Sequence, residues 1–177
     1  PGSIAARRGA VNVHARRPRA RQPRRLESAI PCPRYPAMRV VCFNCNGIRS
    51  RMHQLQAIVE RHAPAVIGLQ ETKVVGADFP AAEVRARGCH VAWHGQKSHY
   101  GVALLTREEP VHTWQGLPGD GEEAQRRFIG AEVQTAQGPL RVFNGYFPQG
   151  ENRAHATKFP GKEKFYADVT GFLHATQ

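Results

Sequence analysis

Residues 65–74 read AVIGLQETKV, and the rest of the chain is arranged around this stretch. The unbroken apolar run of residues 65–69 predicts a strand that is buried on both faces. Glu71 falls where that run ends, with Gln70 and Lys73 beside it. Because ligand sites in α/β sheets gather at the carboxyl ends of strands, Glu71 is well placed for chemistry. The same spacing also fits a capping acid paired with Lys73, and this stretch alone favours neither reading.

Further strands and helices surround this central strand. Apolar runs predict strands at residues 39–43, 65–70, 89–93 and 101–106, and a β-hairpin formed by residues 127–133 and 140–146. Apolar residues at helical spacing predict helices at residues 51–62, about 80–87 and about 161–175. The Gly-, Pro- and acid-rich residues 107–125 are predicted to be a loop. Strands and helices together indicate the α/β class.

Three polar residues share one feature, because each comes at the end of an apolar strand: Asn44, Glu71 and Tyr146. Mg²⁺ prefers oxygen ligands and takes few of them from protein. A carboxylate and an amide carbonyl therefore make a credible half of a metal site. Asn44 alone is better explained by an Asx-turn, and Tyr146 alone by a half-buried ring with its hydroxyl on a carbonyl.

The positive charge of the chain is unevenly distributed. The net charge is +11, and residues 1–37 hold nine arginines and one glutamate, which leaves +3 for residues 38–177. We predict a disordered Arg- and Pro-rich extension over residues 1–37 and one folded domain over residues 38–177. The extension could be a nucleic-acid-binding arm, a transit peptide or upstream sequence translated from an early start codon. Met38, directly before the first strand, favours the third.

Several function classes find no support in the sequence. There is no Walker loop, GxGxxG or GxSxG motif, and no apolar run of membrane-spanning length. Cys42 and Cys45 have CxxC spacing, but no second pair follows to complete a zinc site. The four irregularly placed cysteines fit a reducing compartment, so we expect a soluble cytoplasmic protein with no membrane partner.

Five stretches together resemble the exodeoxyribonuclease III family of bacteria, a branch of the endonuclease/exonuclease/phosphatase superfamily. They read FNCNGIRSR, PAVIGLQETKV, HGQKSHYGVALLT, GDGEEAQRR and NGYFPQGENR, in that order. The resemblance runs from Met38 to about residue 175. It implies a four-layered α/β sandwich of two sheets with helices outside, of which this chain holds the N-terminal half.

The resemblance implies a Mg²⁺- or Mn²⁺-dependent phosphodiesterase acting on duplex DNA, at 3′ ends and beside abasic sites. Family members are usually monomeric. Asn44 and Glu71 would belong to the metal site, and Tyr146 would lie against the scissile phosphate. The DNA- and phosphate-binding residues implied by position are Asn46, Gln70, Lys73, Arg127 and Gln149. Basic and aromatic residues also interleave in the loops, a pattern that fits either phosphate contacts or scattered solvated charges.

The chain departs from the family in lacking two motifs, a Gly-Asp-x-Asn strand end and a terminal Ser-Asp-His. Asp168, on the last predicted helix, stands in the wrong context to replace the missing aspartate. We therefore expect a truncated nuclease that is inactive alone, with the apolar face of its first sheet exposed. Two alternatives remain open at this point: a DNA-binding fragment without catalysis, and a phosphatase-type member of the same superfamily.

Overall fold

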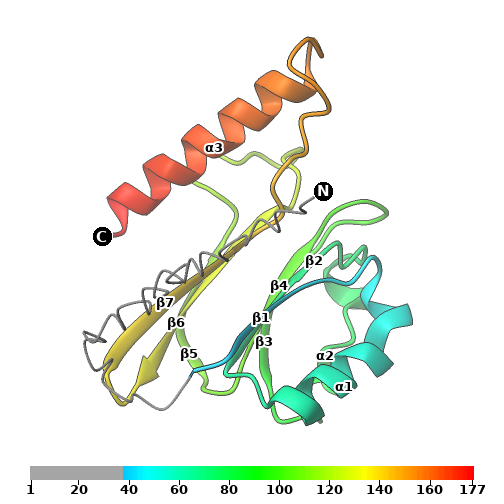
Figure 1. The fold of residues 1–177 in the computed structure, drawn as a ribbon, viewed down its shortest axis with the longest axis vertical. Helices are drawn as coiled ribbons and strands as arrows, with labels where there is room; N and C mark the ends of the chain where they lie inside the picture. The colour runs from blue at the N-terminus through cyan, green and yellow to red at the C-terminus, as the bar shows by residue number, and fades with distance from the viewer. Residues whose placement is uncertain (1–37) are drawn as a thin grey trace, which may run out of the picture. The chain divides into compact units, whose positions relative to one another are not determined.

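The structure, a computed structural model, describes residues 38–177. The extension predicted for residues 1–37 lies outside the described residues. Within the described part, two β-sheets stack face to face, and helices cover their outer sides (Figure 1). None of the described helices is both long and apolar enough to cross a bilayer.

The first sheet contains β2 (Val66–Gln70), the strand formed by the apolar run that precedes Glu71. Its strands lie in the order β1-β2-β4-β3, with bounds Val40–Asn44, Val66–Gln70, Val102–Thr106 and His90–His94. All five residues of β2 are buried, which confirms the strand expected from the apolar run. Strand β1 is parallel to β2, and β4 is antiparallel to it. Asn44, Gln70 and Val102 therefore lie side by side at the same end of the strands. The carboxyl ends of β1 and β2 therefore meet there.

Helices α1 (Met52–His62) and α2 (Ala81–Arg85) cover the outer face of this sheet. A short 3₁₀ turn precedes each of them, Ile48–Arg51 and Gly76–Asp78. In α1, Leu55 is fully buried because it faces the sheet, and Ile58 and Val59 pack beside it. The helix ends at His62, as predicted, and its capping residue Ala63 adopts a left-handed conformation immediately before Pro64.

The second sheet has the order β5-β6-β7, with bounds Pro110–Gln115, Phe128–Thr135 and Gly138–Gly145. The predicted hairpin of β6 and β7 is confirmed. The prediction of a loop over residues 107–125 was wrong in part, because it missed β5. This edge strand is mostly exposed. Its apolar residues Val111 and Trp114 are separated by His112 and Thr113, so the sequence does not show the alternation of apolar and polar residues that predicts a strand.

The two sheets bury their facing apolar surfaces against each other. Val66, Val102 and Leu104 of the first sheet pack with Ile129 and Ala131 of β6 in one buried cluster. The expectation that the first sheet would expose its apolar face was therefore wrong. The reason is that the hairpin of β6 and β7, together with β5, is long enough to supply a partner sheet from within this chain.

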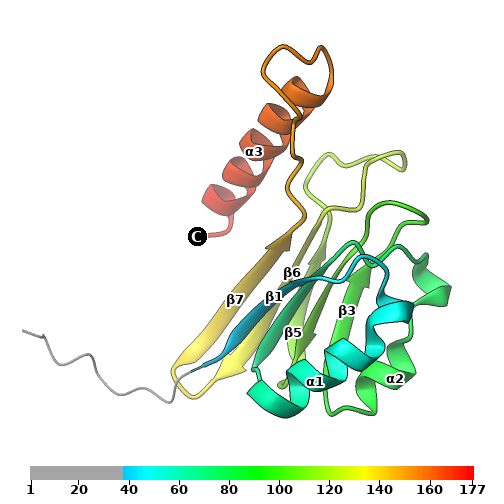
Figure 2. The same ribbon diagram turned by 45° about the vertical axis from the view of Figure 1, so that its right-hand side comes forward.

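Helix α3 (Lys158–Ala175) closes the opposite side of the second sheet. Phe172 of α3 packs against Phe128, Phe143 and Trp114 in an aromatic cluster. The helix begins three residues before the predicted start because Pro160 occupies its first turn, where proline is tolerated. The layers are therefore helices, sheet, sheet and helix, the order implied by the family resemblance (Figures 1 and 2).

Each sheet has two outer strands. The edge strands β3 and β5 of the two sheets lie next to each other (Figure 2). The other edge strand of the second sheet, β7, lies over β2 and β4, and β1 is the other edge strand of the first sheet. Among the described residues, β1 and β7 each have a paired neighbour on one flank only. The outer flanks of β1 and β7 therefore have unpaired backbone groups that could accept another strand, and Val40, at the start of β1, is 57% exposed.

Candidate active site

Five side chains that are distant in sequence come together where the strands of the two sheets end. Asn44 closes β1, Glu71 follows β2 and Tyr146 follows β7, while Tyr100 and Arg127 precede β4 and β6. Backbone hydrogen bonds continue the pairing beyond the strands, from Lys73 to Tyr100 and from Tyr146 to Arg127. This continued pairing holds the loop residues in fixed positions on both sheets.

The carboxylate of Glu71 is the centre of this group. Its Oε1 accepts hydrogen bonds from Asn44 Nδ2 at 2.7 Å and from the Tyr146 hydroxyl at 2.8 Å. Its Oε2 lies 3.1 Å from the ammonium group of Lys73. The hydrogen bond from Asn44, with those from Tyr146 and Lys73, lowers the pKa of Glu71 below its ordinary value despite partial burial. The carboxylate is therefore ionised at neutral pH.

The structural roles considered for Asn44 and Glu71, an Asx-turn and an ion pair with Lys73, are also observed. Asn44 Oδ1 accepts a hydrogen bond from the backbone N–H of Asn46 at 3.1 Å, which is the Asx-turn considered for it. Glu71 and Lys73 form the considered ion pair, and Lys73 also donates to Asn46 Oδ1. The turn and the ion pair hold the carboxylate in place, so they do not compete with a functional role.

Three residues of the loops around Glu71 adopt left-handed backbone conformations that side chains usually avoid. Their φ angles are +44° for Asn46, +54° for Glu71 and +57° for Lys73. Conformations of this kind cost free energy, of order 1–3 kcal/mol each, and they cluster at functional sites. Here they turn the amide, the carboxylate and the ammonium group toward one another.

Arg127 is fixed between two tyrosine rings. Its guanidinium carbon lies 4.4 Å from the ring centre of Tyr100 and 4.7 Å from that of Tyr146. Its Nη1 also donates to the backbone carbonyl of Tyr146 at 2.8 Å. Burial and the hydrogen bond to Glu71 raise the pKa of Tyr146, so its hydroxyl stays protonated and can donate. The stack presents one positive charge beside one hydroxyl donor.

A groove of about 660 Å³ opens over these groups, and five of the eight predicted site residues line it: Glu71, Lys73, Arg127, Tyr146 and Gln149. Asn44 and Asn46 adjoin it through their bonds to Glu71 and Lys73. Gln70 differs, because it is buried and its side chain donates to Asn144 Oδ1 beneath the site. Gln70 therefore supports the site from below instead of lining it.

Sequence reasoning missed two residues of this arrangement. Tyr100 was noted only as an aromatic loop residue, although it stacks on Arg127. Asn144 was overlooked, yet it is buried and bonds to Gln70 and to two backbone carbonyls of the first sheet. Strand β7 also contains Arg141 and is only partly buried, so no local pattern marked Asn144 as a buried residue.

The oxygen atoms at this site suit a hard cation better than zinc. Glu71 offers a carboxylate, and Asn44 Oδ1, which accepts the Asn46 N–H, has a second lone pair to offer. Two such oxygens match the small protein share of a Mg²⁺ or Mn²⁺ coordination shell. The described residues contain no cluster of three or more His, Cys, Asp or Glu side chains. Burial raises the pKa of the Cys45 thiol to about 11, so this cysteine of the CxxC pair is not a thiolate.

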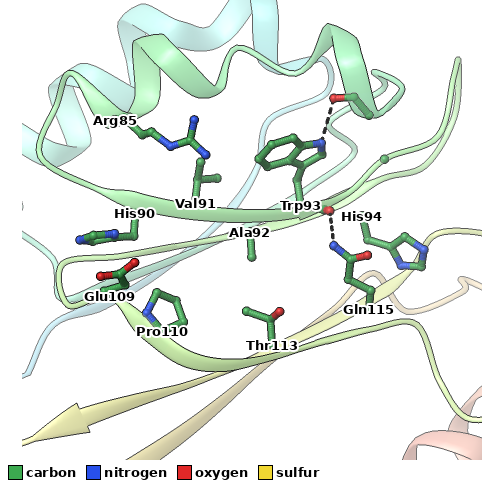
Figure 3. A pocket seen from close by; sticks show the side chains of 12 residues that line it. Arg85, His90, Val91, Ala92, Trp93, His94, Glu109, Pro110, Thr113 and Gln115 are labelled. Carbon is green, nitrogen blue, oxygen red and sulfur yellow. Dashed lines mark hydrogen bonds between the residues drawn. The ribbon is translucent and has the colours of Figure 1, made fainter.

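A second groove of about 660 Å³ lies between the edge strands β3 and β5, on the other side of the sheets (Figure 3). Gln115 donates to the backbone carbonyl of Trp93 there, and the Trp93 indole donates to the carbonyl of Gly76. Its charged residues, Arg85 and Glu109, form no ion pair with each other. Both hydrogen bonds end on backbone carbonyls and not on a shared side chain.

Comparison with known proteins identifies relatives of this chain. Exodeoxyribonuclease III of Haemophilus influenzae is 57% identical over 136 residues, which are 77% of this chain and 51% of that protein. The 3′ phosphatase NExo from Neisseria, solved with a product DNA hairpin, superimposes with a TM-score of 0.72 at 35% identity. That match covers 79% of this chain and 52% of the Neisseria chain.

A third relative has the same relation to this chain. An AP endonuclease from Archaeoglobus fulgidus superimposes with a TM-score of 0.71 at 31% identity, over 80% of this chain and 52% of its own. The chain thus spans about half the length of the relatives that it matches. Residues 41–175 match the Endonuclease/Exonuclease/phosphatase family, and the chain belongs to that family.

Proposed function

We propose that this chain carries the metal- and phosphate-binding half of a DNA-repair nuclease that hydrolyses phosphodiester bonds. The observation that carries the proposal is the Glu71 carboxylate, ionised and held by Asn44, Tyr146 and Lys73 at the meeting point of two sheets. The relatives named above, an exodeoxyribonuclease, a 3′ phosphatase and an AP endonuclease, support the reaction class.

Glu71 and Asn44 would hold the cation, Mg²⁺ or Mn²⁺. A bound divalent cation would supply charge neutralisation on the phosphoryl oxygens. The Tyr146 hydroxyl and the Arg127 guanidinium stand on the same groove as Glu71 and would bind the non-bridging oxygens of a phosphate. Lys73 and Gln149 line the same groove and would contact the flanking phosphates.

The proposed substrates are duplex DNA with 3′ ends and DNA with abasic sites. Three cationic side chains, Lys73, Arg127 and Lys158, line the groove beside two carboxylates, Glu71 and Glu151, so the lining has a net positive charge that fits a polyanion. An abasic-site endonuclease and a 3′ phosphatase among the structural neighbours support both substrate types.

We further propose that these 177 residues are inactive by themselves. Besides Glu71, the carboxylate that lines the groove in the described part of the chain is Glu151, and its ion pair with Lys158, which lowers its pKa, makes it a poor general base. Strands β1 and β7 end beside the site, at Asn44 and Gly145, and among the described residues each has one unpaired flank. Strands added there, from the half that the relatives possess and this chain does not match, would complete the groove.

The test compares this chain with a fusion in which it is joined to the unmatched half of the Haemophilus influenzae relative. Each is incubated with a duplex oligonucleotide that carries one abasic site, with Mg²⁺ or with EDTA. We expect Mg²⁺-dependent incision by the fusion and none by the chain alone. No incision by a fusion that unfolds cooperatively would contradict the proposed reaction.

Two other results would point to the alternatives. Salt-sensitive DNA binding by the fusion without incision, unchanged in Glu71→Gln, would indicate a binding protein. Release of phosphate from a 3′-phosphorylated end without cleavage of phosphodiester bonds would indicate the phosphatase branch. Incision by the chain alone would disprove the proposed inactivity.

A further inference from the structure

A polar cluster is buried between the two sheets directly beneath the site. Asn144 of β7 is 7% exposed and Gln70 of β2 is 6% exposed. Asn144 Nδ2 donates to the backbone carbonyls of Leu69 at 2.8 Å and Ala103 at 3.0 Å. Its Oδ1 accepts a hydrogen bond from Gln70 Nε2 at 2.5 Å. One side chain of the second sheet is thus bonded to both central strands of the first sheet.

These bonds differ in kind from the other contacts in the interior between the sheets. The neighbouring cluster of Val66, Leu104 and Ile129 is apolar, and apolar contact stabilises without fixing direction. Hydrogen bonds in a buried environment are directional, and an amide left unpaired there costs about 1–3 kcal/mol. The Asn144 amide therefore resists sliding of one sheet over the other, which the apolar cluster would permit.

The glycine in the middle of β2 supports this view independently. A Cβ atom at Gly68 would lie 2.9 Å from Asn144 Oδ1 and 3.0 Å from its Cγ. Glycine weakens the interior of a strand, and it is expected there only where something approaches the backbone closely. At Gly68 the approaching group is the Asn144 amide, so β2 has a space that this side chain fills.

The cluster of Asn144 and Gln70 is close in sequence to two residues of the site, Tyr146 and Glu71. Tyr146 is two residues beyond Asn144 and so points to the same face of its strand, and Glu71 directly follows Gln70. The hydroxyl of Tyr146 reaches Glu71 Oε1 at 2.8 Å across the gap between the sheets. A slip of one residue along a strand is about 3.3 Å, which is enough to break that bond.

We propose that Asn144 is a positioning residue that sets the Tyr146 hydroxyl against the Glu71 carboxylate by bonding β7 to the ends of β2 and β4. Asn144 acts through Tyr146 and does not line the groove. Its meaning for catalysis rests on the function proposed above. The alignment itself is a property of the fold and can be measured without any activity.

The experiment uses this chain with ¹³C at the ζ carbon of its four tyrosines. Tyr146→Phe identifies the Tyr146 resonance, and Glu71→Gln gives the shift that follows the loss of the carboxylate partner. In Asn144→Leu, which keeps the size of the side chain, we expect the Tyr146 resonance to move by at least half of that shift. The Tyr166 resonance, from α3, should stay in place.

Ile129→Val is the matched control, because it removes apolar contact from the same interface without removing a directional bond. We expect it to lower the melting temperature and leave the Tyr146 resonance unchanged. An unchanged Tyr146 resonance in folded Asn144→Leu would overturn the proposal. If Asn144→Leu does not fold, Gln70→Met decides in the same way, because it removes the 2.5 Å bond to Asn144 together with the longer Gln70 contacts to Cys42 and Gly68. Failure of the nuclease assay would leave this result untouched.

Discussion

The two grooves of this molecule have the same volume, about 660 Å³, and differ in almost everything else. At the site groove, Tyr146 and Lys73 both bond to the Glu71 carboxylate, and Glu71 and Lys73 have left-handed backbone conformations. Between β3 and β5, side chains such as Gln115 bond to nearby backbone carbonyls instead (Figure 3). Convergence of polar groups on one point, and not size, therefore distinguishes the proposed site.

The largest expected effect comes from removing the central carboxylate. Glu71→Gln in the fusion should lower Mg²⁺-dependent incision by about 100-fold or more, since a preorganised charge at the reacting phosphate is lost. Glu109→Gln, the same change in the groove between β3 and β5, should leave the rate within about twofold of the parent. Equal losses in both variants would remove the distinction between the grooves.

A glycine pair tests the close packing beneath the site. Gly68→Ala should lower the free energy of unfolding by about 1–3 kcal/mol, because its methyl group would collide with the Asn144 amide. Gly171→Ala, at an exposed position of α3 with nothing within 4 Å, should raise it by about 0.5–1 kcal/mol through helix propensity. Urea titrations measure both, and a neutral Gly68→Ala would contradict the contact.

The next effect concerns the stacked guanidinium group. Arg127→Lys keeps the charge but loses the planar stack on Tyr100 and Tyr146, and should lower the free energy of unfolding by about 0.5–2 kcal/mol. Arg85→Lys, in the groove between β3 and β5, is the matched control and should change stability by less than about 0.5 kcal/mol. If both variants melt alike, the stack contributes nothing.

The smallest expected effect is a pH dependence in the groove between β3 and β5. Burial lowers the pKa of His94, so the folded state disfavours its protonated form. Stability from this residue is complete above the ordinary value of about 6.5 and is lost as the pH falls below it. Melting curves at pH 7 and 5.5 should show a smaller loss in His94→Gln than in the parent chain.

The lowered pKa of Glu71 acts in a different window, because its stabilisation is lost only as the pH falls below about 4.5. An equal slope in His94→Gln and the parent chain would contradict the burial of His94.

Sequence reasoning reached the site because local pattern was sufficient for it. Asn44, Glu71 and Tyr146 each stand at the end of a strand that the apolar runs revealed, and parallel pairing of β1 and β2 brings two of them together. The family resemblance added Arg127 and Gln149, which line the same groove. Neither source revealed how far the side chains would be from one another.

The parts that were missed depend on contacts distant in sequence. Asn144 bonds to residues of β2 and β4 that lie 41 to 75 positions away, and nothing in its own neighbourhood marks it as buried. Strand β5 was missed because exposed edge strands lack alternation. The inner face of the first sheet is buried because the three strands of the second sheet pack against it. The sequence did not reveal that these strands form a sheet that covers the first one.

The most direct test of the central claim is to map where a divalent cation binds to this chain. Substoichiometric Mn²⁺ added to the ¹⁵N-labelled chain broadens amide signals near its binding site, even when binding is weak. The account predicts selective broadening at Asn44–Asn46, Glu71–Lys73 and Tyr146, and its loss in Glu71→Gln. Broadening centred on His90, His94 and Glu109 between β3 and β5, or unchanged by Glu71→Gln, would contradict it.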